Sequence, residues 1–98
     1  MSKFGALIDL EIPVLIDFFA EGDQASVAMN PVLREVAAAL GDQVKVIKID
    51  VEKNPDLAEA LRVKGLPTLV VYKRGEMKWR QSGAQSVTSL TSVIQKFI

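Results

Sequence analysis

The chain has 98 residues, which is enough for one domain with a single hydrophobic core. Lys plus Arg and Asp plus Glu both number 12, so the net charge is zero and we expect no nucleic-acid and no membrane partner. The sequence has no Cys and no His, which excludes thiol chemistry and the usual zinc ligands, so we expect no cofactor and no metal site. No apolar segment approaches the roughly 20 residues of a membrane span, and no secretory signal is present, so we expect a cytoplasmic location.

The first half of the chain predicts a helix, a buried strand and a second helix. Ser2 can cap a helix over Lys3–Leu10, in which apolar residues recur at helical spacing. Val14–Phe19 is almost wholly apolar, which is typical of a central strand that helices cover on both faces. The pattern over Ala25–Leu40 is that of an amphipathic helix, which Pro31 either starts or kinks because proline lacks the backbone N–H.

The second half predicts a strand, a helix, a hairpin and a last helix. Val44–Asp50 alternates apolar and charged side chains, as a half-buried strand does. Asn54, followed directly by a proline, is a strong helix start. The segment PTLVVYKRGEMKWRQ predicts two strands around Arg74 and Gly75, which form a tight hairpin. Apolar residues at helical spacing predict a final helix that begins after Ser86: Val87, Leu90, Ile94 and Phe97.

These elements predict an α/β fold with one domain over residues 1–98. A strand–helix–strand unit with a right-handed crossover gives two parallel strands, and the hairpin adds an antiparallel pair. Helices must cover both faces of this four-stranded mixed sheet, because its central strand is apolar on both faces. The sequence therefore predicts a three-layer α/β/α sandwich.

Three segments match one known pattern in order and spacing: PVLIDFFAE, DVEKNPDLAEALRVKGLPTLVVYKRGE and SGAQSVTSLTSVI. The first resembles PVLVDFWAE of the thioredoxin family. The second resembles the segment that carries the family's V-G-I-P-T motif and hairpin, and the third resembles its closing segment and last helix. The resemblance covers about residues 4–98 and implies a thioredoxin-like fold in which the family's N-terminal strand is missing.

The active-site motif of that family is absent from this chain. Where thioredoxins have W-C-G-P-C, the chain has Gly22, Asp23, Gln24, Ala25 and Ser26. Asp23 stands at the place of the nucleophilic cysteine, and Ser26 at the place of the resolving one. Disulfide exchange needs a thiolate and a second thiol, and neither a carboxylate nor a hydroxyl can replace them. We therefore expect a redox-inactive chain without catalytic residues, in which Asp23 serves chiefly as a helix cap.

The resemblance also implies that other parts of the site remain. Asp17 matches a buried carboxylate of the family, and Lys48 matches a lysine on the neighbouring strand. We expect the two to form a buried charge pair in which the pKa of Asp17 is raised. The GLPT segment resembles the cis-proline loop, where the residue before proline pairs with the extended chain of a client. The expected binding groove consists of Phe19, Gly22, Asp23, Gln24, Ala25, Ser26, Leu66, Pro67, Thr68, Gly83 and Ala84.

The missing N-terminal strand has a consequence for the predicted strand Val44–Asp50. In the family the two are neighbours, so here we expect this strand to form an open edge of the sheet. Open edges invite pairing with another chain, although Lys45 and Lys48 oppose it. A homodimer through this strand is therefore one possible assembly.

Several functions are compatible with this interpretation of the sequence. The leading hypothesis is a protein- or peptide-binding module that uses the groove around the cis-proline loop. A second is a structural or assembly subunit that acts through the sheet edge. A third is an enzyme that uses Asp23, Asp17 and Ser26, although no base is placed beside Ser26. An assignment to cell redox homeostasis on resemblance alone is a further alternative.

Overall fold

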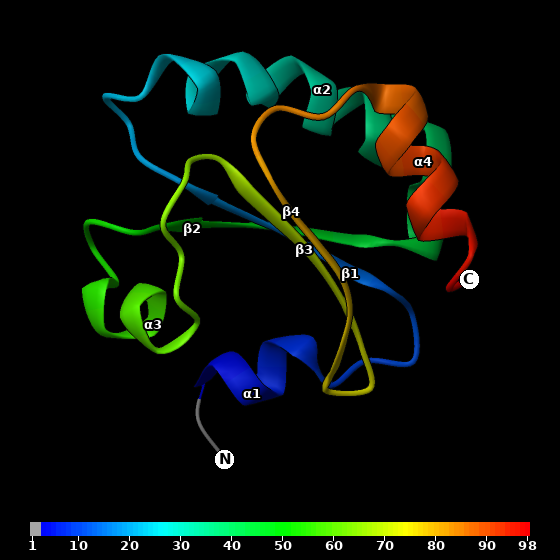
Figure 1. Ribbon diagram of the computed structural model, residues 1–98. Coiled ribbons are helices and arrows are strands. Elements are labelled where there is room, and N and C mark those ends of the chain that lie inside the picture. Colours follow the sequence, from blue (N-terminus) through cyan, green and yellow to red (C-terminus); the bar gives the residue numbers. More distant parts are fainter. Residues whose placement is uncertain (1–2) are drawn as a thin grey trace.

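Four strands form one mixed sheet in the structure, a computed structural model that describes residues 3–98 (Figure 1). Strands β1 (Val14–Phe19) and β2 (Lys45–Asp50) are parallel, whereas β3 (Thr68–Lys73) and β4 (Glu76–Ser82) form an antiparallel hairpin. Strand β3 also pairs with β1 in the antiparallel direction, so the order across the sheet is β2, β1, β3, β4. This is the mixed sheet that the sequence predicts.

Two helices cover each face of the sheet, which gives the predicted three layers. Helices α2 (Gln24–Leu40) and α4 (Val87–Gln95) lie on one face, and α1 (Lys3–Ile8) and α3 (Pro55–Ala60) lie on the other (Figure 1). A short 3₁₀ helix, Gly41–Gln43, connects α2 to β2. The predicted cap of α1, Ser2, lies outside the described residues.

The apolar side chains divide into two clusters, one on each side of the sheet. Successive residues of a strand point to opposite faces, so β1 contributes to both clusters. The cluster beneath α2 and α4 consists of Leu15, Met29, Leu33, Val36, Leu40, Val44, Leu69, Val71, Leu90 and Ile94. The cluster toward α1 and α3 consists of Ile8, Val14, Ile16, Phe18, Ile49, Val70 and Tyr72.

Local residue chemistry explains most of the element boundaries. Arg74 and Gly75 have φ of 54° and 80°, the left-handed backbone that a tight two-residue hairpin turn requires. The Ser86 side chain accepts a hydrogen bond from the backbone N–H of Ser89 and caps α4, which begins directly after Ser86 as predicted. Helix α2 neither starts nor ends at Pro31, which lies inside it, so the alternative that Pro31 starts the helix is wrong.

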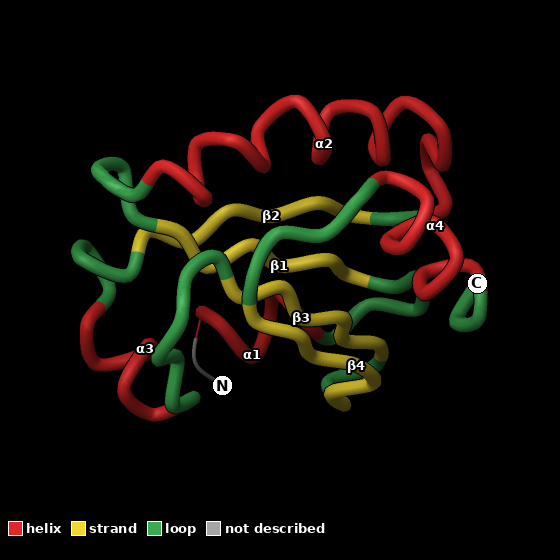
Figure 2. Tube along the Cα trace, turned by 45° about the horizontal axis from the view of Figure 1, so that its top comes forward, coloured by secondary structure: helices red, strands yellow, loops and turns green. Residues whose placement is uncertain are grey.

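Strand β2 is an edge of the sheet, as the sequence predicts. Figure 2 shows β2 and β4 at the two sides of the sheet, with β1 and β3 between them. Within residues 3–98 no strand precedes β1. No helix in the same described range is long and apolar enough to cross a bilayer. The cytoplasmic location stays a prediction.

Candidate functional site

The predicted groove residues come from three loops at one end of the sheet. Phe19 ends β1, Thr68 begins β3 and Ser82 ends β4. Because β3 runs antiparallel to both of its neighbours, these three positions lie at the same end of the sheet. The loops that follow or precede them hold the residues that take the place of the family's active site (Figure 1).

The proline loop and the turn before α4 are joined to each other. The Leu66–Pro67 peptide bond is cis. The backbone N–H of Gly83 donates to the Pro67 carbonyl at 2.8 Å. The Thr68 hydroxyl bonds to the Gly65 carbonyl and lies 3.3 Å from the Ser82 hydroxyl. Pro67 and Thr68 are buried, whereas Leu66 and Gly83 are half-buried and Ala84 is exposed. These hydrogen bonds hold the proline loop in place, and part of the Leu66 side chain stays exposed to solvent.

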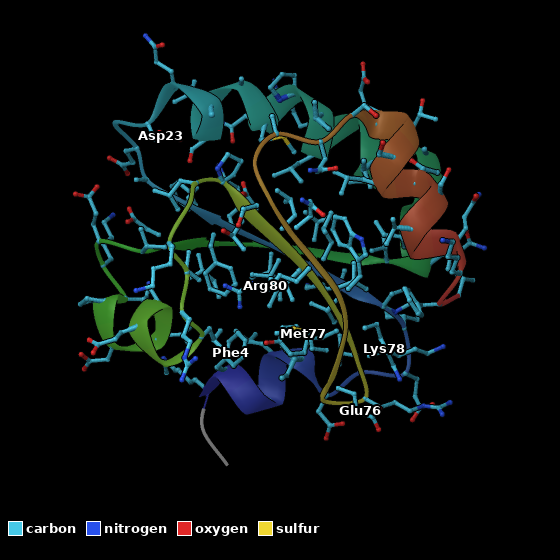
Figure 3. The ribbon with its side chains drawn as sticks, viewed as in Figure 1. Phe4, Asp23, Glu76, Met77, Lys78 and Arg80 are labelled. Carbon is cyan, nitrogen blue, oxygen red and sulfur yellow. The ribbon has the colours of Figure 1, made fainter. Side chains whose placement is uncertain are left out.

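The loop that replaces the W-C-G-P-C motif is held by hydrogen bonds among its own residues. Asp23 has extended backbone, and its Oδ2 accepts a hydrogen bond from the Ser26 N–H at 2.8 Å, which caps α2 (Figure 3). The N–H of Asp23 donates to the Ala20 carbonyl at 3.1 Å, and the Ala20 N–H donates to Ser26 Oγ at 3.3 Å. Ser26 is buried. The polar groups of Asp23 and Ser26 are thus used in building the loop.

Open space surrounds the position that corresponds to the family's tryptophan. Gly22 is exposed, and a Cβ added to it would meet no atom within 4 Å. Gln24 is exposed and Ala25 is half-buried, so the start of α2 presents a small and mainly polar surface. Phe19, the last residue of β1, is half-buried below it.

Asp17 lies in the middle of β1 and is fully buried. Its side chain has no exposed surface, and neither carboxylate oxygen has a hydrogen-bond partner among the described residues. Burial disfavours the charged form and raises the pKa of Asp17 to about 6, while the charge of Lys48 acts in the opposite direction. The predicted buried carboxylate with a raised pKa is therefore present.

Lys48 does not complete the predicted buried charge pair. It is the register neighbour of Asp17 on β2, but it is exposed. Its ammonium group donates a hydrogen bond to Asn30 Oδ1 on α2 and lies 4.4 Å from the centre of the Phe19 ring. The prediction is wrong in this part because the long lysine side chain reaches past Asp17 to polar and aromatic partners at the surface.

Sequence reasoning missed a hollow on the other side of the loop. It has a volume of about 270 Å³ and opens between β1, β2 and the start of α2. Asn30 follows Ser26 by four residues in α2, so the two share a helix face, and this spacing could have placed Asn30 at the site. The hollow is lined by Phe19, Ala20, Glu21, Ser26, Val27, Asn30 and Lys48.

The arrangement lacks the two thiols of the family's reaction. A thiolate is impossible in a chain without cysteine. The Ser26 hydroxyl is buried and accepts a hydrogen bond from the Ala20 N–H, and among the described residues no hydrogen bond joins it to a basic side chain. No group of three or more metal-binding side chains occurs within the described part of the chain. What the three loops offer is a half-buried Leu66 on a fixed proline loop and an exposed Gly22 at the loop before α2.

Comparisons with known proteins agree with this geometry. The family model described as Thioredoxin matches residues 2–96. A thioredoxin-like protein of Synechocystis is 37% identical over 86 residues, which are 88% of this chain and 82% of that protein. A thioredoxin of Rickettsia felis is 32% identical over 92 residues, 94% of this chain and 88% of the relative. The solved mitochondrial thioredoxin 3 of Saccharomyces cerevisiae superposes with a TM-score of 0.86 at 31% identity, over 96% of this chain and 87% of that one. The chain therefore belongs to the thioredoxin family.

Proposed function

We propose that this chain is a redox-inactive member of the family that binds an extended protein or peptide segment at the groove around Leu66–Pro67. The observation that supports it most directly is the difference between the two halves of the site. The proline loop is held in place by the Gly83 N–H, whereas Asp23 and Ser26 have replaced the cysteines. The retained proline loop supports a role in recognition, and the loss of both cysteines supports the lack of redox activity.

The lack of redox activity follows from the chemistry of the exchange. A thiolate must attack the substrate disulfide, and a second thiol must then release the mixed disulfide. Asp23 supplies a carboxylate that already caps α2, and Ser26 supplies a buried hydroxyl. Neither side chain can form the sulfur–sulfur bond that the first step requires. We therefore expect a disulfide-reduction assay to give no rate above background.

Binding is supported by the exposed part of the groove. Leu66 is half-buried, and the space above Gly22 is open, so an extended segment has room to lie against the proline loop. Backbone hydrogen bonds from such a segment would supply affinity, and contacts with Leu66 would supply preference for apolar side chains. Phe19 faces Lys48 on the β2 side of the loop. The proposed binding surface lies at the end of the sheet that holds the replaced W-C-G-P-C motif.

A direct test compares capture of partners by two matched variants. Leu66→Asp places a charge in the groove, and Met77→Asp makes the same kind of change at an exposed position of β4 (44% exposed). We expect proteins captured by the unmodified chain to be retained by Met77→Asp and lost from Leu66→Asp, with circular dichroism confirming that both variants fold. Recovery of the same partners with Leu66→Asp would contradict the groove proposal.

A second candidate function is assembly through the sheet edge. It is favoured by one observation, that within residues 3–98 β2 pairs with β1 alone. Strand addition at such an edge joins proteins without using the groove. The homodimer through residues 44–50 is one form of this assembly and stays a prediction.

A further inference from the structure

The outer side of β2 presents backbone groups for another strand. The N–H groups of Lys45 and Val51 donate to Pro13 and Phe19, on the side toward β1. Because hydrogen-bonding direction alternates along a strand, the backbone groups of Val46 and Lys48 point to the open edge. Figure 2 shows this edge along the side of the molecule, away from β3 and β4. An extended segment could extend the sheet here.

Hollows lie on both faces of the sheet beside this edge. On the α2 side a hollow of about 430 Å³ is lined partly by Leu33, Ala37 and Val46. On the opposite face a hollow of about 370 Å³ is lined partly by Phe4 and Leu57. Successive side chains of a strand added to β2 would point to opposite faces of the sheet, so each hollow can receive every second side chain. The edge therefore offers side-chain sites together with backbone pairing.

The charges around the edge are mainly positive. Lys45 and Lys48 are exposed on β2, and Lys48 lines both hollows. Arg34 lines the hollow toward α2, and Lys3 lines the other. The Asp50 carboxylate accepts hydrogen bonds from the N–H groups of two following residues, at 2.8 and 3.3 Å, so it is used within its own turn. A partner that carries carboxylates would complement this rim.

We propose that the β2 edge binds an extended segment of another protein in which apolar and acidic residues alternate. The acidic side chains lie on the α2 side and meet Lys48 and Arg34, and the apolar side chains enter the hollow beside Phe4 and Leu57 on the opposite face. The backbone pairs with Val46 and Lys48. A second copy of this chain fits less well, because it would bring its own edge lysines to the same strand. This inference concerns a different surface from the groove and does not depend on the proposal made for it.

The test measures binding of synthetic peptides to the full chain. The probe is a fluorescein-labelled nine-residue peptide of alternating valine and glutamate, and its counterpart alternates valine and lysine. We expect the acidic peptide to bind saturably and the basic one to show no saturation. Lys48→Glu should weaken binding about tenfold, whereas Lys96→Glu, the same charge change in an exposed residue after α4, should leave it unchanged.

A proline at the edge tests the backbone pairing separately. Val46→Pro removes an N–H that points outward, a change that edge strands tolerate, and we expect it to abolish peptide binding while circular dichroism stays unchanged. Equal binding of the two peptides, or equal loss with Lys96→Glu, would overturn the inference. So would a dimer in sedimentation that Val46→Pro converts to monomer, because a second copy would then be the occupant. Loss of peptide binding with Leu66→Asp would move the peptide to the groove.

Discussion

Asp17 and Lys48 are direct register neighbours on β1 and β2, but the Lys48 side chain extends past Asp17 to the surface, which separates the two charged groups. The Lys48 ammonium bonds to Asn30 and lies over the Phe19 ring, at the surface of the molecule. The Asp17 carboxylate stays below it without a hydrogen-bond partner among the described residues. The fold thus carries a buried carboxyl group whose charged form is only weakly compensated.

This arrangement predicts that stability falls as pH rises through the mildly acidic range. Burial raises the pKa of Asp17 from 3.8 to about 6, so between these values the folded state holds a proton that the unfolded state has lost. The free energy of unfolding should therefore decrease from about pH 4 to about pH 6 and then level off, by roughly 2–3 kcal/mol in total. Urea unfolding at pH 4.5 and 7.5 measures it.

Asp17→Asn supplies the matched control for that pH dependence. The amide does not titrate, so the slope between the two pH values should flatten and the variant should be more stable than the unmodified chain at pH 7.5. An ordinary Asp pKa in a carbon-13 NMR titration of Asp17 would contradict this account.

Several element boundaries follow from the local sequence alone. Strand β1 has the predicted bounds because its apolar run is unambiguous, and the hairpin turn is set by Arg74 and Gly75. Helix α2 begins one residue earlier than predicted because its start is fixed by the cap at Asp23. Local patterns also place the groove loops at one end of the sheet, since strand directions follow from element order.

The sequence could not show which hydrogen-bond partners the long side chains reach. The preference of Lys48 for Asn30 depends on how closely α2 packs over β2, and that distance is a property of the assembled fold. The same holds for Arg80, which the sequence places only on the second strand of the predicted hairpin. In the structure its guanidinium group reaches across to the end of α3.

Removing the Asp23 cap should destabilise the fold without changing its binding surface. Asp23→Ala loses the hydrogen bond to the Ser26 N–H, and we expect a decrease of about 1 kcal/mol in the free energy of unfolding. Asp23→Asn keeps an accepting oxygen and should lie within a few tenths of a kcal/mol of the unmodified chain. Urea unfolding measures both. If partner capture is lost with Asp23→Asn while stability is retained, Asp23 contacts the partner directly.

Restoring two cysteines should restore redox chemistry, because the frame of the site remains. The double variant Asp23→Cys, Ser26→Cys places thiols three residues apart at the start of α2, where neighbouring side chains lie about 5–6 Å apart. The free N–H groups of the helix start favour the thiolate of the first cysteine. We expect insulin reduction with dithiothreitol to rise clearly above background. The single Asp23→Cys variant should stop at a mixed disulfide, and an inactive double variant would show that the groove no longer admits a disulfide substrate.

Arg80 should be a main contributor to the stability of the loop that leads to the groove. Its two guanidinium nitrogens donate to the carbonyls of Leu61 and Arg62, at the end of α3 (Figure 3). Arg62 has a φ of 55°, a left-handed conformation that needs support in a residue other than glycine. Arg80→Met should therefore lower the free energy of unfolding by about 1.5–3 kcal/mol, since hydrogen bonds to charged groups are lost.

The pKa of Tyr72, the single tyrosine of the chain, gives a second measurement of the effect of Arg80→Met. Burial raises the pKa of Tyr72, and the charge of Arg80 acts against that rise. Arg80→Met should therefore raise the pKa of Tyr72 further, whereas Arg80→Lys, which keeps the charge but lacks the planar fork, should leave this pKa near its original value and still lose stability. Absorbance titration and urea unfolding give the two readouts. Full stability of Arg80→Met would show that water replaces the guanidinium group at both carbonyls, and the fork would then contribute nothing to holding α3.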